Sequence, residues 1–381
     1  MERSEIIKKF LSEGFQLDSS ALKFLLKNED KIENILTRLK ENKPKELVLS
    51  SEILQKFLEE APTKIDIIPR NYSTKEMVSV EDITNFFVNR YSNIWNILSK
   101  RMELVNLISI NKITQKIDKF SLIVMIRKIE GNKIFVEDLT GQLKLELRSN
   151  QNILLTEDEV IGVVCKRFNE NFLVENVYYP DIPLKKEVLH TTEDINCFFI
   201  PIEKINEKKL NGVEKELEEK NNLFFLFLDS NSNKTFYEEI IPFFPKVRTF
   251  IISEEKIQKE MEGYNFLSDP AFVKVEELVL LLTNGKFLKY YSDVWKISLD
   301  QIVLNLIKKR HLNPSFKFSK KIFVSDPFFL DIVPDIVYVN YPSIFASLNY
   351  KGTTILVNGN AEESAIWKVN LKTRENIKIF L

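Results

Sequence analysis

Few side chains in this sequence are suited to nucleophilic, acid–base or metal chemistry. Its 381 residues include two histidines, His190 and His311, and two cysteines, Cys165 and Cys197. Nucleophile–base pairs cannot be assembled convincingly from them, and the sequence contains no P-loop, Rossmann glycine pattern or Gly-x-Ser-x-Gly elbow. His311 follows a basic helix end, where it can simply favour the helix dipole. Both cysteines lie in apolar, strand-like runs, so we expect buried thiols rather than a zinc cage. The sequence therefore predicts no catalytic residue, no metal and no cofactor.

The composition indicates a folded protein without an electrostatic preference for nucleic acid or membranes. Apolar residues make up 44% of the chain and charged residues 29%, and the formal net charge is −1. These values are typical of globular proteins, and the length predicts two or three domains. No stretch approaches the roughly 20 apolar residues of a membrane span, and the N-terminus lacks a secretory signal. We expect a cytoplasmic protein with no membrane partner.

Residues 1–60 are predicted to form a small helical domain. Gly14 is placed to end the first helix, and Ser19 and Ser20 are placed to cap the second. Core packing is the simplest explanation of the apolar stripes; docking on a partner is the alternative, which periodicity does not exclude. The stripes lie at helical spacing within residues 6–11, 22–26, 32–39 and 53–58.

A linker and a long helix are predicted next. The stretch 61–80 contains two prolines and no lasting hydrophobic period, so it is interpreted as a linker that is partly extended. A connecting amphipathic helix is expected over 81–103. The apolar face of this helix carries Ile83, Phe86, Phe87, Tyr91, Ile94 and Leu98.

Residues 104–184 are predicted to form a small closed barrel. The stretch 143–148 alternates between leucine and charged residues, which is typical of a strand with one buried face. Turns are expected at Gly131-Asn132 and between Asp138 and Gly141. They separate five predicted strands at 121–129, 133–137, 143–147, 159–166 and 172–178.

The barrel could bind single-stranded nucleic acid or serve as a rigid spacer. Nucleic-acid binding would use stacked aromatic rings in a basic groove. Here the outward positions carry mixed charge, and the aromatic residues Phe168, Phe172, Tyr178 and Tyr179 lie at or near the barrel's end. We favour a spacer that also packs on the next domain.

Residues 185–381 are predicted to form layers of strands and helices. Apolar runs at 197–202, 223–228, 247–252 and 279–282 alternate with charged, helix-prone stretches, and a helix is expected at 299–309. Further buried strands are predicted at 322–324, 336–339 and 354–357, between Pro, Asp and Gly breaks. The fold class is therefore α+β and multidomain.

Several passages carry a family resemblance. They are YPDIPL at 179–184, KRHLNP at 309–314, VPDI at 333–336, YKG at 350–352 and LVNG at 356–359. In these passages the chain resembles the small (B) subunit of archaeal family D DNA polymerase, which is related to the B-subunits of eukaryotic replicative DNA polymerases. The resemblance implies a helical N-terminal domain, an OB-fold β-barrel and a calcineurin-like phosphoesterase sandwich.

The resemblance also implies a phosphoesterase site that has lost its metals. In the family, Asp, Asn and His side chains on five loops hold two ions that activate a hydroxide. The histidines are missing here, and neither His190 nor His311 falls at a ligand position. Glu203, Asp229 and Asn284 could hold a weak Mg²⁺ ion, but we favour solvated residues at loop tips. The degenerate metal-site positions are Pro201, Glu203, Asp229, Asn284, Tyr341 and Ser343.

As a function, the resemblance implies a non-catalytic small subunit that scaffolds the large catalytic subunit of a replicative DNA polymerase. Its partner would be the C-terminal, zinc-bearing region of that subunit, with DNA contacted mainly through the complex. Primase or the sliding clamp are the expected contacts of the N-terminal unit. An active 3′–5′ proofreading exonuclease and a single-stranded DNA-binding OB protein are the alternatives, which the missing histidines and the near-zero net charge disfavour. The candidate partner interface is Tyr341, Ile344, Phe345, Tyr178 and Tyr179.

Overall fold

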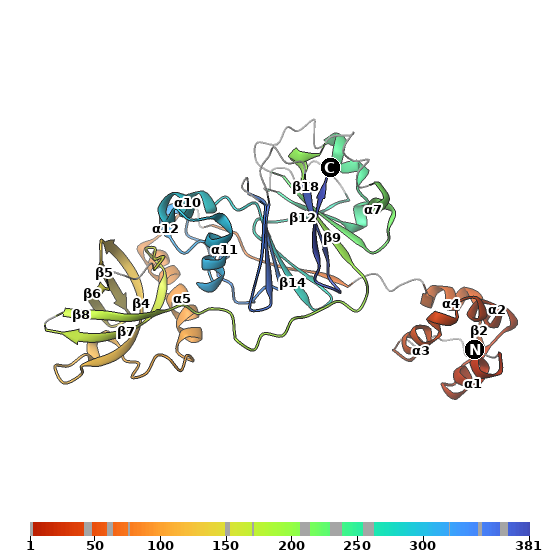
Figure 1. Cartoon of the computed structure of the whole chain (residues 1–381), viewed down its shortest axis with the longest axis horizontal. Helices are drawn as coiled ribbons and strands as arrows, with labels where there is room; N and C mark the ends of the chain where they lie inside the picture. Colours follow the sequence, from red (N-terminus) through yellow and green to blue (C-terminus); the bar gives the residue numbers. More distant parts are fainter. Residues whose placement is uncertain are drawn as a thin grey trace. The chain divides into compact units, whose positions relative to one another are not determined.

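The computed structural model describes residues 3–41, 48–58, 64–74, 77–148, 153–169, 171–205, 214–228, 238–253, 263–319, 321–341, 345–358 and 365–381. The chain divides into two compact units, Met1–Ile65 and Asp66–Leu381 (Figure 1). Within these described ranges, no helix combines the length and the apolar character needed to cross a bilayer.

The first unit is a helical domain with its own core, as the sequence predicts. A short parallel pair, β1 (Gln16–Leu17) and β2 (Val48–Leu49), joins two of its loops. Ile6, Phe10, Leu25 and Leu39 are fully buried in its centre. The apolar stripes are therefore core. Its helices are α1 (Arg3–Ser12), α2 (Ser19–Lys27), η1 (Glu29–Lys31), α3 (Ile32–Glu41) and α4 (Ser51–Leu58).

The cap of α2 differs from the prediction. Asp18, rather than Ser19 or Ser20, is the N-cap residue: its carboxylate accepts the Ala21 backbone N–H at 2.7 Å. A carboxylate satisfies this donor and also interacts favourably with the positive end of the helix dipole. The Ser20 hydroxyl donates to Asp18 and accepts the Ser51 N–H at 2.9 Å. Ser20 thus ties α2 to the start of α4.

Part of the predicted linker is docked. β3 (Ile65–Ile68) is the edge strand of a sheet in the second unit, next to β13 (Ala271–Val275). Farther along, the Arg70 guanidinium lies 4.3 Å from the centre of the Phe272 ring, and the Tyr72 hydroxyl donates to the Pro270 carbonyl. The prediction of a linker over 61–80 is therefore too long, because the four-residue run IDII is too short to register as a strand by periodicity.

Helix α5 (Val80–Leu98) follows, close to the predicted limits of 81–103. A reciprocal capping box starts it: Ser79 Oγ accepts the Asp82 N–H at 3.1 Å, and the Asp82 carboxylate accepts the Ser79 N–H at 3.0 Å. One face of α5, including Tyr91 and Leu98, packs on the outside of the barrel. The helix thereby belongs to the second unit.

Five strands form the closed barrel that the sequence predicts. Their order is β4-β5-β6-β8-β7, which is consistent with an OB-fold. Leu122, Val136, Leu145, Val163 and Val174 are buried in its interior. The strands are β4 (Lys119–Glu130), β5 (Lys133–Asp138), β6 (Gly141–Leu147), β7 (Val160–Phe168) and β8 (Asn171–Tyr178).

The rest of the second unit contains two six-stranded sheets among its described residues. The first has the order β12-β11-β10-β9-β18-β19, with its first four strands parallel. They are β9 (Asn196–Pro201), β10 (Asn222–Phe227), β11 (Thr249–Ile252), β12 (Asn265–Leu267), β18 (Ala365–Asn370) and β19 (Asn376–Phe380).

The second sheet has the order β16-β17-β15-β14-β13-β3, and β14, β15 and β17 are parallel. Its remaining strands are β14 (Leu278–Thr283), β15 (Ile336–Val339), β16 (Ala346–Tyr350) and β17 (Thr353–Val357). Helices cover both outer faces (Figure 1). They are α7 (Glu214–Glu218) on the first sheet, and α10 (Leu288–Trp295) and α11 (Leu299–Lys308) on the second.

Aromatic rings fill the space between the two sheets. The Tyr338 ring lies 4.6 Å, centre to centre, from the rings of both Phe199 and Phe227. Phe199 stacks in turn on Phe225, and Phe225 on Phe250. The high phenylalanine content is thus concentrated in a sandwich core, where large rings contribute much buried area.

The strand prediction fails at 322–324. Phe323 makes only an isolated bridge to Thr74, and Val324 is 56% exposed. This apolar run belongs to a loop whose rings pack on Phe86 of α5. The predicted strands at 336–339 and 354–357 are confirmed as β15 and β17.

Limited proteolysis should separate the two units near residue 64, not near residue 80. The hydrogen-bonded β3 and the docked residues after it should protect the chain beyond Ile65. Intact mass measurement of the stable product identifies its first residue. Tyr72→Ala, which removes the hydroxyl bonded to Pro270, should let fragments starting near residue 80 accumulate. Such fragments from the wild-type chain would contradict the docking of β3.

Candidate functional site

The carboxyl ends of the parallel strands form the edge at which α/β sandwiches usually bind ligands. β10 ends before Leu228, β14 before Asn284, β15 before Asn340 and β17 before Asn358. Three asparagines therefore occupy equivalent positions on adjacent strands of the second sheet. Asn284 and Asn358 are buried.

The three asparagines form a chain of hydrogen bonds. Asn358 Nδ2 donates to Asn340 Oδ1 at 2.9 Å, and Asn340 Nδ2 donates to Asn284 Oδ1 at 2.9 Å. Asn284 Nδ2 donates to the Leu228 carbonyl at 3.1 Å, which lies on the first sheet. The amide chain, defined as Asn358, Asn340 and Asn284, thus links the two sheets at their ligand-binding edge.

A buried carboxylate supports the turn at Asn284. Asp269 Oδ1 accepts the Thr283 hydroxyl at 2.7 Å and the Asn284 N–H at 3.1 Å. Burial raises the pKa of Asp269, and these bonds oppose the shift. Gly285 follows with φ of +64°, and a Cβ there would come within 2.8 Å of Val339. Sequence reasoning overlooked Asp269, which lies outside the motifs.

The described part of the edge contains little that could hold a metal ion. No group of three or more His, Cys, Asp or Glu side chains with suitable placement occurs in the described ranges. The Oδ1 atoms of Asn284 and Asn340 already accept neighbouring amides. The described part of the edge is suited to joining strands rather than to acid–base or metal chemistry.

The described members of the predicted metal-site positions lie at or just after the ends of β9, β14 and β15. Pro201 is buried at the end of β9, Glu203 is exposed on η3 (Ile202–Lys204), and Tyr341 is half-buried. Asn284 is buried in the amide chain, so its interpretation as a solvated loop-tip residue is wrong: its amide is held at both ends. Asp229 and Ser343 lie outside the described residues.

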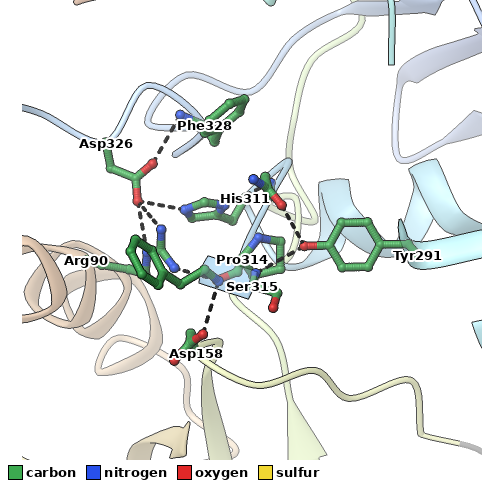
Figure 2. A network of polar contacts seen from close by, with 10 residues as sticks. Arg90, Asp158, Tyr291, His311, Pro314, Ser315, Asp326 and Phe328 are labelled. Atoms are coloured by element: carbon green, nitrogen blue, oxygen red, sulfur yellow. Dashed lines mark hydrogen bonds and ion pairs between the residues drawn. The ribbon is translucent and has the colours of Figure 1, made fainter. Parts of the chain in front are cut away.

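His311 belongs to a buried polar network that connects α5 to the sandwich domain (Figure 2). Asp326 Oδ2 accepts Arg90 Nε at 2.8 Å and lies 2.9 Å from His311 Nε2. Arg90 also donates to the Pro314 carbonyl, and His311 Nδ1 accepts the Asn313 N–H at 3.1 Å. Both ring nitrogens of His311 are therefore occupied in structural contacts.

Burial and charge set the protonation of this network. Burial alone would raise the pKa of Asp326, but the charge of Arg90 and the hydrogen bonds from His311 and Arg90 lower it well below its usual range. Burial lowers the pKa of His311, and the nearby Asp326 only partly opposes this. At neutral pH the network therefore contains an ionised carboxylate, an arginine and a neutral imidazole.

A second buried ion pair joins the barrel to the sandwich domain. Lys309 Nζ contacts the Glu159 carboxylate and donates to the Leu154 carbonyl at 2.7 Å. The same ammonium lies 4.1 Å from the centre of the Tyr179 ring. Burial raises the pKa of Glu159 and lowers that of Lys309, and each charge opposes the shift of the other. Leaving either charge unpaired here would be strongly unfavourable.

Other residues of the family-like passages also connect separate elements of the second unit. Lys351 Nζ donates to Asp181 Oδ2 at 2.6 Å, and the Tyr350 hydroxyl lies 3.1 Å from the same oxygen. The exit of the barrel thus docks on the turn between β16 and β17. Asp335, which opens β15, accepts the Val279 N–H at 2.9 Å and contacts Lys186. The family-like passages hold elements together rather than carry chemistry.

The described residues of the predicted partner interface fall into two groups. Tyr178 and Tyr179 lie in the joint between barrel and sandwich, where Arg101 and Lys309 contact their rings. Tyr341 follows β15 at the opposite end of the central strands. Phe345, at the same end, is half-buried against Trp367 at 5.5 Å between ring centres. Ile344 lies outside the described residues.

Comparison with known proteins gives a relative that is matched along most of both chains. The DNA polymerase II small subunit of Methanothermobacter thermautotrophicus is 24% identical over 453 residues, covering 93% of this chain and 92% of that protein. This similarity confirms the resemblance to archaeal family D small subunits that the motifs indicate. No protein-family model matches the chain.

Among solved structures, telomere capping protein Ten1 from Saccharomyces pombe is 16% identical, covering 19% of this chain and 77% of its own, with a TM-score of 0.17. The S. pombe Stn1–Ten1 complex is also 16% identical, covering 19% of this chain and 72% of its own, with a TM-score of 0.16. TM-scores this low support no conclusion about fold or function.

Asn340→Ala should lower the free energy of unfolding by about 1–3 kcal/mol. The change removes the donor to Asn284 and the acceptor of Asn358, and it leaves buried polar atoms without partners. Chemical denaturation measures the loss. Gln301→Ala, which truncates an exposed amide on α11, should change stability far less. Equal effects of the two substitutions would contradict a linking role for the amide chain.

Acidification from pH 7 to pH 5 should lower the free energy of unfolding through His311. Burial depresses its folded pKa, so the unfolded imidazole, with a pKa of about 6.5, binds a proton that the folded one does not. This contribution to stability is complete above the unfolded pKa and declines below it, by at most about 2 kcal/mol at pH 5. His311→Gln should flatten the pH dependence and His190→Gln should preserve it. Parallel curves for all three proteins would contradict the assignment.

Proposed function

We propose that this chain is the small subunit of a family D-like replicative DNA polymerase and acts without phosphoesterase activity of its own. The observation that carries the proposal is the similarity to a polymerase small subunit along 93% of the chain. Two six-stranded sheets, a closed barrel and a separate helical unit fit the three domains that the resemblance implies.

The geometry of the strand edge favours a non-catalytic role. A two-metal phosphoesterase needs several convergent His, Asp and Asn ligands with open coordination positions. Here the three strand-end asparagines are hydrogen-bonded to each other and to the Leu228 carbonyl. His311 does not fall at a position of the family's metal ligands, and its ring is held by Asp326. The hydrogen bonds of the amide chain link the two sheets at this edge.

The role that remains is mechanical: to hold the large catalytic subunit. A buried ion pair of Lys309 with Glu159 joins the barrel to the sandwich domain, and one of Arg90 with Asp326 joins α5 to it. Such a fixed pair of domains can present a surface to the zinc-bearing end of a large subunit. The helical unit, Met1–Ile65, would then be the contact for primase or the sliding clamp, and DNA would be met mainly through the complex.

A single-stranded DNA-binding role is the second candidate, and the charges of the barrel argue against it. Lys119 and Arg148 both pair with Glu175 on the outer surface, at 2.7 and 3.4 Å. Cations engaged in this way contribute less to a phosphate-binding groove. Phe168, at the tip of the β7–β8 hairpin, is 68% exposed and would be the stacking residue if this function held.

The purified chain should leave 3′-ended single-stranded DNA intact with either Mg²⁺ or Mn²⁺. The histidine ligands that generate a metal-bound hydroxide in the family are absent from the sequence. Gel analysis of a labelled oligonucleotide checks the outcome. Cleavage that follows the protein through purification and disappears in Asp229→Ala would restore the exonuclease hypothesis.

Coexpression with the polymerase's large subunit should give a stable complex that copurifies. The scaffold role requires that assembly or polymerisation by the large subunit be impaired without this chain. The measurement is primer extension by the large subunit with and without the chain, together with its elution volume. Full assembly and activity of the large subunit alone would contradict the proposal.

A further inference from the structure

The outward side of α5 carries no charged residue between Ile83 and Ser99, although exposed Glu81 and Lys100 lie just beyond its two ends. From Ile83 to Ser99 the one charged residue is Arg90, and its side chain is buried against Asp326. Charged residues make up 29% of the chain, so about five would be expected among 17 residues. The exposed positions of this stretch carry asparagine, threonine, isoleucine and tryptophan instead.

The exposed and half-buried residues of this stretch form two adjacent stripes. With 3.6 residues per turn, positions spaced by three and four residues share one side of a helix. The asparagine stripe is Asn85, Asn89, Asn93 and Asn96, and all four are exposed. The tryptophan stripe is Thr84, Val88, Ser92, Trp95 and Ser99, of which Thr84 and Trp95 are exposed and the other three are half-buried. The opposite side of α5 packs on the barrel and the sandwich domain.

Helix stability does not explain the asparagine stripe. Asparagine is a poor helix former, and glutamate, lysine or alanine would stabilise an exposed helix position better. Within the described part of the chain, the four amides make no hydrogen bond that would compensate. Each carries two donors and an acceptor directed away from the fold. A stripe of this kind is suited to hydrogen-bonding an external backbone or amide surface.

Trp95 supplies an anchor beside that stripe. Its side chain is 42% exposed, whereas Trp295 and Trp367 are buried. Interface cores are depleted in charged residues and enriched in aromatic ones, and tryptophan is over-represented among the residues that dominate binding energy. Met102, just beyond the helix, is 91% exposed and extends the apolar surface.

The absence of charge also selects the class of partner. Nucleic acid and anionic lipid surfaces are bound through clustered lysine and arginine, and this face has neither. Charged groups of a partner would lose their hydration against this face without gaining an opposite charge. An uncharged protein surface avoids that cost. We propose that the outward face of α5, defined by the asparagine and tryptophan stripes, is a docking surface for an uncharged segment of the polymerase's large subunit. This assignment rests on the proposed function.

A charge-introducing pair of substitutions tests the surface without weakening the helix. Asn89→Glu with Asn93→Lys places a favourable i,i+4 pair on α5 while putting two charges into the proposed interface. The matched control is Gln301→Glu with Asn305→Lys, the same pair on α11, where Gln301 is exposed and Asn305 half-buried. Trp95→Ala, with Trp95→Phe as its conservative counterpart, tests the anchor.

The measurement is the Kd of each full-length variant for the purified large subunit, together with its melting temperature and its mass in solution. We expect the α5 pair and Trp95→Ala to weaken binding at least tenfold at unchanged melting temperature, the control to stay within twofold, and Trp95→Phe to lie between. Wild-type affinity in the α5 pair would overturn the inference while leaving the proposed function intact. A wild-type chain that fails to bind the large subunit would overturn the proposed function. A self-dimer abolished by the α5 pair, with large-subunit binding unchanged, would assign the face to a second copy and overturn the chosen partner.

Discussion

The arrangement of the second unit depends on the buried carboxylate of Asp326. It is the common acceptor for Arg90 of α5 and for His311, which follows α11, and its second oxygen lies 3.2 Å from the Phe328 backbone nitrogen. A carboxylate at this depth is tolerated only because a guanidinium neutralises it and hydrogen bonds satisfy its oxygens. Removing either partner would leave a buried charge alone. Helix, barrel and sandwich are therefore held in one specific relation rather than merely packed together.

The two buried ion pairs of this joint differ in chemistry. Arg90 and Asp326 are joined to a histidine and to backbone groups, so the carboxylate keeps its charge down to very acidic conditions. Lys309 and Glu159 lie beside aromatic rings, and burial pushes both toward their neutral forms. Replacing such a pair with apolar residues of similar volume is often neutral for stability. The pair instead fixes how the barrel docks on the sandwich domain, because the Lys309 ammonium contacts Glu159, Leu154 and Tyr179 together in only one orientation.

Much of the fold could be predicted from the sequence, because the barrel strands and β15 and β17 have clear periodicity or strong apolar runs. β3 and the loop at 322–324 could not, since strands of four residues or fewer are decided by what lies beside them. The motifs were correctly singled out, but their residues turn out to be structural: Asp181, Lys309, His311 and Asp335 all join elements. The amide chain could not be predicted from the sequence. Asn340 and Asn358 look like ordinary turn residues there, and only the pairing of parallel strands places them side by side.

The edge position of β3 has a consequence for how load enters the molecule. Anything held by the helical unit pulls on the second unit through the chain that leads into β3 (Figure 1). β3 is hydrogen-bonded to β13, so a load on the helical unit reaches the second unit first through the backbone hydrogen bonds of an edge strand. The contacts of Arg70 and Tyr72 follow the strand in the sequence and hold the chain at a second place. The helical unit is therefore attached through a hydrogen-bonded edge strand rather than through a free hinge.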